Sequence, residues 1–495
     1  MKIPAKVNQI SEIKKIFASL PGGCRVVGVG VSAFQRSGLG YILPNYEILS
    51  LLETADLPAI RQVCPVTVIP GERPQELNTS SILSLNWVKD WLGRRQKTNL
   101  FVYKAATPLD EIIKTLPACA GRPVKLLSSP GYIRKPLEDK KVFRVEACKA
   151  GIQIPAGLNL NLEQLTETKW DQLKQKYGER LVFQLTDYST GGGQGTFFIN
   201  NRDDWQKFWE FTRSQDRKKE LKFVNVCERV AGRSASITGC ATRYGVVTSL
   251  LQTQIIDQPE LVGFKGRNGV WLGHDWTARF SDKAQLNAEK LCQKWGEYIY
   301  QKGYKGIFGL DVVLGENDEI TVIECNSRYT GAFPVYTMLQ LAQGEMPLDV
   351  WHLLEWLGLD YELDLDEVQK VSRQAKAGAH IILHSLENKP VKAGGAVKAG
   401  VWGIRPINSA KKFKDMGAFA PVIDIGWARE GFSLLDIKAD DEFVLCDRIP
   451  NPGQIIKPGE RIGKLIFKRR IIDDEGNLLP EIKAVVASIL TYYNM

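Results

Sequence analysis

Residues 306–331 read GIFGLDVVLGENDEITVIECNSRYTG. The first part of this stretch is apolar and rich in β-branched side chains, which is typical of a strand. Gly315-Glu316-Asn317-Asp318 is a turn signal, and Glu319–Cys325 has the composition of a second strand. The stretch therefore predicts a β-hairpin.

The predicted pairing of this hairpin places Leu314 opposite Glu319 and Asp311 opposite Val322. Side chains two residues apart lie on the same face of a strand. Asp311 and Glu324 are therefore expected to be diagonal neighbours on one face of the hairpin.

Asn326 continues this face, so two carboxylates and an amide oxygen would converge. These are hard oxygen ligands of the kind that Mg²⁺ prefers. Arg328 follows directly as a fixed cation. The alternative is an ordinary hairpin whose acids face solvent. It is disfavoured because Asp311 and Glu324 lie inside apolar runs, where an unpaired carboxylate is costly.

The string Glu324-Cys325-Asn326-Ser327-Arg328 resembles the metal-binding hairpin of ATP-grasp enzymes, whose second strand typically reads acid-x-Asn-x-Arg. The resemblance implies two Mg²⁺ ions held by Asp311, Glu324 and Asn326. It also implies that Arg328 contacts the transferring phosphoryl group or the substrate carboxylate.

Composition narrows the class of protein. A length of 495 residues suggests about three domains. The net charge is +9, but the short basic runs lack the interleaved aromatic residues of a nucleic-acid platform. No apolar run approaches the roughly 20 residues that span a membrane. The nine cysteines form no CxxC pair, which predicts a reducing, cytoplasmic setting. Three of them, Cys24, Cys148 and Cys325, are expected as small core residues.

Residues 1–125 alternate strand-like and helix-like segments, which predicts a small open α/β sheet. Strands are expected at Cys24–Val31, Val66–Pro70 and Asn99–Tyr103, and helices at Ile10–Leu20, Asn45–Glu53 and Trp87–Leu92. Gly28-x-Gly30-x-x-Ala33 fits a variant dinucleotide fingerprint, but no apolar helix follows it. A similar sheet domain precedes the grasp in ATP-grasp enzymes, and that resemblance explains these glycines better than NAD binding does.

Helical periodicity runs from Val142 to Ala150, and Gly151 ends it. Asp139-Lys140, ten residues and then Gly-x-x-x-Pro resemble the start of the ATP-grasp module. In that family the lysine usually contacts nucleotide phosphates. An amphipathic helix with solvated lysines is an equal alternative for Lys140.

A glycine-rich loop separates the expected strands Leu181–Thr186 and Thr196–Ile199. Its glycines are Gly191, Gly192, Gly193 and Gly195. So many glycines cost backbone entropy on ordering, which close approach of backbone N–H groups to an anion would offset. The loop resembles the one that covers ATP phosphates in ATP-grasp enzymes, and a floppy surface hairpin is the alternative.

Two further positions follow from the resemblance. The strand before the glycine loop usually carries a phosphate-binding lysine, and here Gln184 stands in its place. Glutamine donates a hydrogen bond but carries no charge, so Gln184→Lys is expected to tighten ATP binding modestly. Phe223–Gly232 resembles the strand that binds adenine and ribose, with Glu228 accepting the ribose hydroxyls. A solvated glutamate is the alternative there.

Val262–Trp276 is glycine-rich, basic and aromatic, and is predicted to be a loop. Its candidate phosphate contacts are Lys265 and Arg267, with His274 as a weaker one. Ser281-Asp282 is expected to cap a helix that runs to Lys302 and delivers the chain to the hairpin.

The remaining elements are predicted more coarsely. Residues 236–256 are expected to form two antiparallel strands, and helices are expected at Ala332–Gln343 and Pro347–Leu357. After a charged stretch, residues 377–495 are predicted to form short strands and a final helix at Pro480–Tyr492. This last region resembles the β-rich domain that follows the grasp in carboxylate–amine ligases and carboxylases.

Together these features predict an α/β protein with the ATP-grasp fold. Its expected domains are an N-terminal α/β domain at 1–125, an ATP-grasp domain at 126–375 and a β-rich C-terminal domain at 376–495. The resemblance implies a carboxylate–amine ligase that uses ATP and Mg²⁺, with two ions or with Mn²⁺ in their place. The reaction would pass through an acyl phosphate and would need no protein nucleophile.

The expected partners are a small-molecule carboxylate and amine, with neither nucleic acid nor membrane, and a homodimer is left open. An ATP-grasp kinase, a carboxylase and a nucleotide-binding regulatory protein remain alternatives. The presence of Asp311, Glu324, Asn326 and Arg328 together argues against loss of catalysis.

Overall fold

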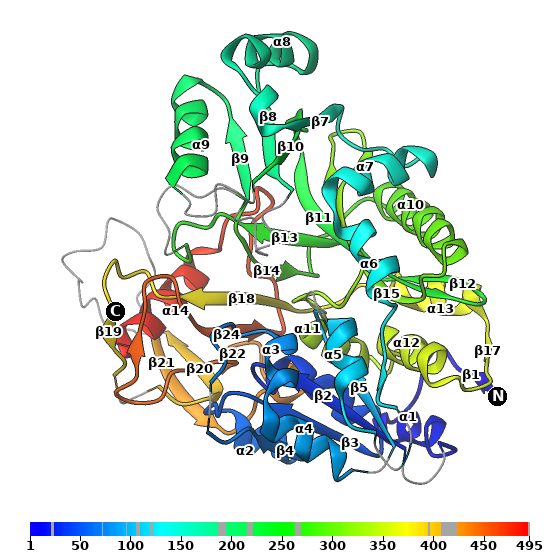
Figure 1. Ribbon diagram of the computed structural model, residues 1–495. Helices are drawn as coiled ribbons and strands as arrows, with labels where there is room; N and C mark the ends of the chain where they lie inside the picture. Colours follow the sequence, from blue (N-terminus) through cyan, green and yellow to red (C-terminus); the bar gives the residue numbers. More distant parts are fainter. Residues whose placement is uncertain are drawn as a thin grey trace.

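The computed structural model describes residues 1–20, 24–71, 73–95, 97–104, 109–118, 121, 123–186, 195–214, 221–262, 269–394, 397–406 and 423–493. A parallel sheet lies at one end, a small antiparallel sheet at the other and a long sheet between them (Figure 1). No helix within these ranges has the length and apolar character needed to cross a membrane.

The N-terminal region forms a five-stranded parallel sheet in the order β4-β3-β2-β5-β6. Its strands are β2 (Arg25–Gly30), β3 (Tyr46–Ser50), β4 (Val66–Val68), β5 (Thr98–Phe101) and β6 (Lys125–Leu126). Around it lie α1 (Ile10–Ile16), η1 (Phe34–Tyr41), α2 (Leu57–Arg61), α3 (Thr79–Ser84), α4 (Asn86–Gly93) and α5 (Leu109–Thr115). The open parallel sheet with flanking helices confirms the predicted architecture of this region.

The prediction of a helix at Asn45–Glu53 is wrong. This segment contains β3, which pairs in parallel with β2 on one side and β4 on the other. Every residue of β3 is buried. Its apolar side chains fit a helix or a strand equally well, and pairing with two neighbours decided between them.

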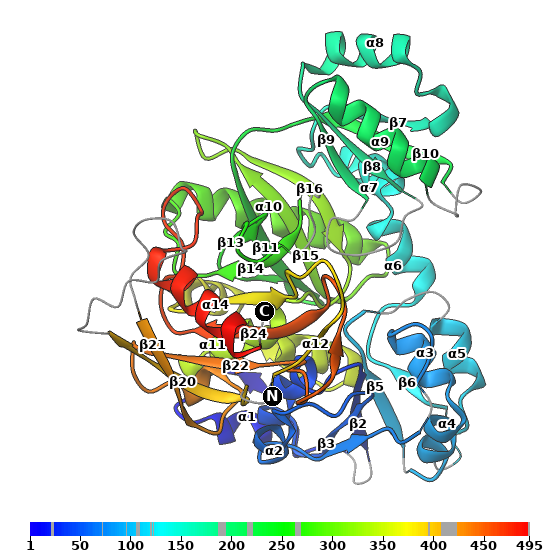
Figure 2. The same cartoon turned by 90° about the vertical axis from the view of Figure 1, so that its left-hand side faces the viewer.

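A four-stranded antiparallel sheet forms a separate lobe in the order β7-β10-β8-β9 (Figure 2). Its strands are β7 (Gly157–Asn161), β8 (Leu181–Leu185), β9 (Thr196–Ile199) and β10 (Phe223–Glu228). The helical elements of this part are α6 (Gly131–Glu138), α7 (Lys140–Lys149), η2 (Leu162–Gln164), α8 (Glu167–Tyr177) and α9 (Arg202–Ser214). The strands confirm those predicted on both sides of the glycine loop.

An eleven-stranded sheet runs through the middle of the molecule in the order β16-β15-β11-β13-β14-β18-β24-β22-β20-β21, with β12 paired to β11. Its first strands are β11 (Arg233–Thr242), β12 (Gly245–Thr248), β13 (Gln252–Ile256), β14 (Trp271–Asp275), β15 (Gly306–Leu314) and β16 (Ile320–Asn326). The others are β18 (Ala379–His384), β20 (Gly400–Pro406), β21 (Ile423–Arg429), β22 (Glu442–Cys446) and β24 (Arg461–Phe467).

The sheet continues across the predicted boundary at residue 375, because β18 pairs with β14. That boundary stays a prediction. Helices α10 (Asp282–Gln301), α11 (Phe333–Ala342), α12 (Leu348–Leu357), α13 (Leu365–Ser372) and α14 (Pro480–Tyr492) and the short η3 (Leu434–Asp436) belong to this part of the chain. Two short pairs complete the fold, β1 (Lys2–Ile3) with β17 (Glu362–Leu363) and β19 (Val391–Lys392) with β23 (Ile455–Ile456).

The helix that precedes the hairpin confirms its prediction. The Ser281 hydroxyl accepts a hydrogen bond from the Ala284 amide at 2.9 Å and caps α10. Cys292, Trp295 and Ile299 are fully buried on one face of this helix. That apolar face packs against the sheet and fixes where β15 begins.

Three smaller predictions are corrected. The segment Val262–Trp276 is not a loop throughout, because its last part forms β14 between β13 and β18. Residues 236–256 contain the β11–β12 hairpin and the additional strand β13. Cys148 is exposed, whereas Cys24 and Cys325 are buried as predicted.

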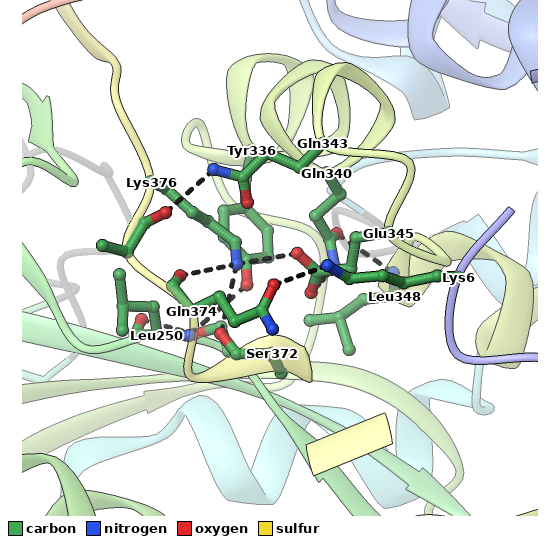
Figure 3. A network of polar contacts seen from close by, with 12 residues as sticks. Lys6, Leu250, Tyr336, Gln340, Gln343, Glu345, Leu348, Ser372, Gln374 and Lys376 are labelled. Atoms are coloured by element: carbon green, nitrogen blue, oxygen red, sulfur yellow. Dashed lines mark hydrogen bonds and ion pairs between the residues drawn. The ribbon is translucent and has the colours of Figure 1, made fainter. Parts of the chain in front are cut away.

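A buried ion pair fastens the turn after α11 to the segment after α13 (Figure 3). Lys376 Nζ lies 2.7 Å from Glu345 Oε2, and the Lys376 side chain is fully buried. Lys376 also donates to the Ser372 carbonyl at 3.1 Å, while Gln340 donates to Glu345 at 3.0 Å. The pair therefore joins two parts of the segment that leads from the β15–β16 hairpin to β18.

Candidate active site

The β15–β16 hairpin brings Asp311 and Glu324 together, but in a different register from the one predicted. Leu314 pairs with Ile320, and Asp311 lies directly opposite Glu324. The turn is one residue longer than expected, and a bulge between Asp311 and Val312 shifts the pairing again. The predicted diagonal relationship is therefore wrong, while the shared face is confirmed.

Asp311 lies at the centre of a hydrogen-bonded group. Asn326 Nδ2 donates to its Oδ2 at 3.0 Å, and Gln254 Nε2 donates to its Oδ1 at 2.7 Å. Burial and the charge of the neighbouring Glu324 raise the pKa of Asp311 well above its usual value. Gln254 reaches the site from β13, and no local sequence pattern indicates this contact.

Two cations flank these acceptors. Lys140 Nζ lies 3.3 Å from Glu324 Oε2. Burial is the largest single influence and opposes the ionisation of Glu324, but Lys140, Asp311 and Arg328 together outweigh it and lower the pKa of that carboxyl. Arg328 Nη2 donates to Asn326 Oδ1 at 2.7 Å, and Arg328 Nε lies 3.5 Å from Glu138 Oε1. The structure thus groups five of the predicted side chains on the hairpin face. They are Lys140, Asp311, Glu324, Asn326 and Arg328.

The donor set fits Mg²⁺. Asp311 and Glu324 offer carboxylate oxygens and Asn326 an amide oxygen, which are the ligands that this ion takes, together with water and phosphate oxygens. Among the described residues, no group of three or more His, Cys, Asp and Glu side chains is arranged to hold a metal. Asp311, Glu324 and Asn326 stay the predicted ligands of such an ion.

A narrow pocket opens beside the hairpin, between α7 and the small sheet. Its lining consists of Lys140, Phe143, Arg144, Ile154, Pro155, Gln184, Asn225, Cys227 and Ile323. The lining combines apolar side chains with two amides and two cations, and the enclosed space is small. Lys140 belongs both to this pocket and to the acidic pair, so it connects the two.

Gln184 lies in this pocket, where its Oε1 accepts a hydrogen bond from Asn225 Nδ2 at 3.0 Å. Asn225 Oδ1 in turn accepts from Arg144 Nε at 3.1 Å. Sequence reasoning missed Arg144. The signal was available, because Lys140 and Arg144 are four residues apart and share one face of α7.

A second missed cation, Lys104, follows β5 in the N-terminal region. Burial and then the charge of Arg328 lower its pKa, whereas Glu138 and Glu324 act in the opposite direction. Its electrostatic neighbours come from α6, from β16 and from the segment just after β16, so no local sequence signal could have found it.

Glu228 ends β10, and its Oε1 accepts a hydrogen bond from the Ala156 amide at 2.8 Å. Its role toward a ribose stays a prediction. Gly195 accepts from the Leu185 amide at 2.9 Å, where the glycine loop rejoins the sheet. The other predicted contacts, Gly191, Gly192, Gly193, Lys265 and Arg267, lie outside the described residues.

His274 is unsuited to the phosphate contact that was predicted for it. The ring is buried on β14, with Nε2 3.1 Å from Ser236 Oγ. Burial and the nearby Lys464 lower the pKa of His274 to about 3. At neutral pH this imidazole is uncharged, so it supplies no positive charge to a phosphate.

The chain was compared with known protein families. Residues 138–332 match the family described as the ATP-grasp domain. This range runs from just before Lys140 to just after Arg328, so it contains the hairpin and the neighbouring pocket.

A curated relative, the [butirosin acyl-carrier protein]–L-glutamate ligase of Niallia circulans, is 36% identical over 90 residues. That alignment covers 18% of this chain and 19% of the ligase.

Solved structures resemble the chain over nearly its whole length. The N5-carboxyaminoimidazole synthase of Aspergillus clavatus has a TM-score of 0.53 at 14% identity and covers 95% of this chain and 99% of its own. A biotin carboxylase from Campylobacter jejuni has a TM-score of 0.59 at 12% identity, with 90% and 88% covered. At such low identity the likeness concerns the fold alone, and it confirms the predicted ATP-grasp architecture.

Proposed function

We propose that this chain, whose residues 138–332 form an ATP-grasp domain, is an ATP-dependent ligase that joins a small-molecule carboxylate to an amine. The observation that carries the proposal is the meeting of Asp311 and Glu324 across the hairpin, with Lys140 and Arg328 on either side. Acidic oxygens for a metal and cations for phosphates occur together there. Phosphoryl transfer depends mainly on such positioning and charge neutralisation.

The positions of the side chains suggest a different role for each group of residues. Lys140, Arg144 and Gln184 line the pocket that would take the nucleotide, so its phosphates would extend toward the hairpin. Arg328, held by Asn326, would meet the γ-phosphate or the substrate carboxylate. Mg²⁺ held by Asp311, Glu324 and Asn326 would neutralise phosphate charge during the transfer.

The proposed reaction balances in two steps. A substrate carboxylate oxygen attacks the γ-phosphorus, and the bond between the γ-phosphorus and the oxygen that bridges to the β-phosphate breaks. ADP departs, and an acyl phosphate is formed. The amine nitrogen then attacks the acyl carbon, a carbon–nitrogen bond forms, and phosphate departs as the amine loses a proton. Arg328 would stabilise the charge that develops in the first step.

Similar proteins support the cofactors of this proposal. The Aspergillus synthase was crystallised with ADP and 5-aminoimidazole ribonucleotide, and a Hydrogenobacter thermophilus carboxylase domain with MgADP and bicarbonate. The name of the Niallia ligase describes the joining of L-glutamate to an acyl-carrier protein. We propose that this chain also uses ATP and Mg²⁺. Metal titration of the activity would determine whether one or two ions bind and whether Mn²⁺ can replace Mg²⁺.

The test is ADP release with MgATP across pairs of amino acids and small carboxylates, with each product identified by mass. A ligase sustains ADP release over many turnovers only when both an acid and an amine are present, because the amine consumes the acyl phosphate formed in the first step. Release that needs bicarbonate would instead indicate a carboxylase, and phosphorylation of a hydroxyl a kinase. Binding of MgATP without ADP release under every condition would contradict turnover and leave a regulatory protein.

A further inference from the structure

A second group of positively charged side chains lies away from the hairpin, where the C-terminal strands meet the N-terminal sheet (Figure 1). We call it the basic cluster, and it consists of Arg36, Arg448, Arg461 and Lys464. Arg36 belongs to η1 after β2, Arg448 follows β22, and the other two lie on β24. None of them has a role in the function proposed above.

The cluster has fewer carboxylate partners than cations. Asp447 pairs with Arg461, accepts from Ser32 Oγ at 2.8 Å and is fully buried. In the described part of the chain, Arg448 and Lys464 form no ion pair, whereas the Arg36 guanidinium donates to the Val29 carbonyl at 2.8 Å and to Gln35 Oε1 at 3.0 Å. Burying a cation without a partner is costly, so an anionic ligand would complete this cluster.

Lys464 is the clearest case. The residue is 1% exposed, and within the described ranges its Nζ donates a single hydrogen bond, to the Gly331 carbonyl at 3.4 Å. The ammonium also lies 5.4 Å from the centre of the Phe34 ring. Arg448 Nε and Arg461 Nε likewise have no hydrogen-bond partner among the described residues. Several buried donors of the cluster therefore lack a full set of hydrogen-bond partners in the described part of the chain.

Backbone strain marks the same place. Asp447 and Arg448 are consecutive non-glycine residues with φ of +59° and +64°. This left-handed conformation is uncommon for side chains other than Asn and Asp, and strained residues gather at ligand sites. The Asp447 amide donates to Asp56 Oδ2 at 2.8 Å, which helps to hold the strained turn in place.

The N-terminal sheet indicates this location independently. Its strand order reverses between β2 and β5, and open α/β sheets bind ligands beyond the carboxyl ends of strands at such a point. Arg36 follows β2 and lies 5.2 Å from the centre of the Tyr103 ring, which follows β5. A Cβ atom on Gly30 would overlap the Arg36 guanidinium, so this glycine makes room for a cation rather than for a dinucleotide.

The cluster is also within reach of the hairpin. Lys464 contacts Gly331, which follows Arg328 by three residues. Three residues span at most about 11 Å, so the Lys464 ammonium lies within roughly 15 Å of the Arg328 backbone. A metabolite of moderate length could reach from one to the other.

From these observations we propose that the basic cluster binds an anionic head group, a carboxylate or a phosphate, of a substrate whose reacting end lies at the hairpin. The inference rests on the proposed ligase function and specifies its substrate class. Arg448 and Arg461 are half-buried and would meet the anion first, while Lys464 and Arg36 support it from behind.

The test is calorimetric titration with inorganic phosphate and, separately, with succinate at constant ionic strength. The protein is first saturated with Mg²⁺ and AMP-PNP, which fills the γ-phosphate position and prevents phosphate from binding there. Wild type is expected to bind at least one anion with a millimolar or lower Kd, and the preferred anion identifies the head group. Arg448→Gln should weaken binding about tenfold or more, because a charge-assisted hydrogen bond is lost.

Lys468→Gln is the matched control, since Lys468 is exposed just beyond the same strand and loses the same charge. Its affinity should stay within twofold of wild type. A second variant, Lys464→Met, separates ligand binding from a structural role. It should weaken anion binding without lowering Tm, whereas a structural lysine would cost stability.

The inference is overturned if wild type binds neither anion at 20 mM, a concentration about twentyfold above a Kd of about 1 mM. Unchanged affinity in Arg448→Gln also overturns it, as does a fall in Tm of Lys464→Met with anion affinity intact. AMP-PNP binding, measured first, is independent of these outcomes. Its absence would count against the proposed function, and its presence without anion binding would count against the basic cluster alone.

Discussion

Asp311 lies directly opposite Glu324 across the β15–β16 hairpin, next to a bulge that turns a diagonal relationship into a facing one. Two carboxylates this close disfavour each other's ionisation, and the pKa of Asp311 is raised while that of Glu324 is lowered. One cation, Lys140, reinforces the difference from the Glu324 side. A divalent cation between the two acids would favour the charged form of both.

We therefore expect Asp311→Asn and Glu324→Gln each to reduce Mg²⁺-dependent ADP release by at least about a hundredfold, while Tm changes little, because transition-state charge is left without its counter-ion. ADP release across a Mg²⁺ titration measures the effect. Glu316→Gln, in the exposed turn of the same hairpin, is the control and should retain wild-type activity. Wild-type rates in both site variants at limiting Mg²⁺ would show that the metal binds elsewhere.

The pocket beside the hairpin gives a second expectation. Arg144 supplies a positive charge near Gln184, so Arg144→Gln should weaken ATP binding about tenfold or more in calorimetry. Lys149→Gln, which removes an exposed charge from the end of the same helix, is the control. Equal ATP affinity in the two variants would remove Arg144 from the nucleotide site.

The structure reverses the expectation for Gln184→Lys. Gln184 accepts a hydrogen bond from Asn225, and lysine has no acceptor. A lysine there would also bring a third cation beside Lys140 and Arg144. The variant should therefore bind ATP no more tightly than wild type, and tighter binding in the same titration would contradict this.

The buried pair of Lys376 and Glu345 should matter for stability rather than for catalysis. Glu345→Gln leaves the Lys376 ammonium buried without a counter-ion, which typically costs about 3–5 kcal/mol. The urea midpoint should fall accordingly. Lys6→Gln removes only an exposed hydrogen bond to Gln374 in the same network and should have an effect below about 1 kcal/mol. Matching midpoints in the two variants would contradict this role for the pair.

Lys464 gives an expectation in pH. Burial is the main cause that lowers its pKa to about 7, followed by Arg461, while Asp447 and Cys446 act in the opposite direction. The other titratable groups that face it are His380 and His274, whose pKa values are themselves lowered by burial and by Lys464. Below pH 7 the folded lysine is charged and bears its full burial cost.

Between pH 7 and 10.5 the unfolded chain binds more protons at Lys464 than the folded chain does, so stability at this position rises with pH. The Tm advantage of Lys464→Met over wild type should accordingly be largest at or below pH 7 and shrink toward pH 10. Thermal melts of both proteins at matched pH values measure it. A difference that stays constant across this range would show that Lys464 does not titrate as described.

Local pattern alone was enough to identify several elements. The hairpin, the helix capped by Ser281 and the final helix at Pro480–Tyr492 follow from turn residues, capping residues and apolar periodicity, which act between near neighbours in the chain. The convergence of Asp311, Glu324 and Asn326 follows from strand alternation and was also visible in the sequence.

Tertiary structure decided the rest. Pairing with β2 and β4 made β3 a strand where the sequence suggested a helix, because backbone pairing with two buried neighbours outweighs local propensity. The register of Asp311 against Glu324 depended on a bulge that no residue pattern announced. The contacts of Gln254 with Asp311 and of Lys464 with Gly331 join residues far apart in the chain. Burial and charge in such places are set by what packs around a side chain, which the sequence specifies only through the whole fold.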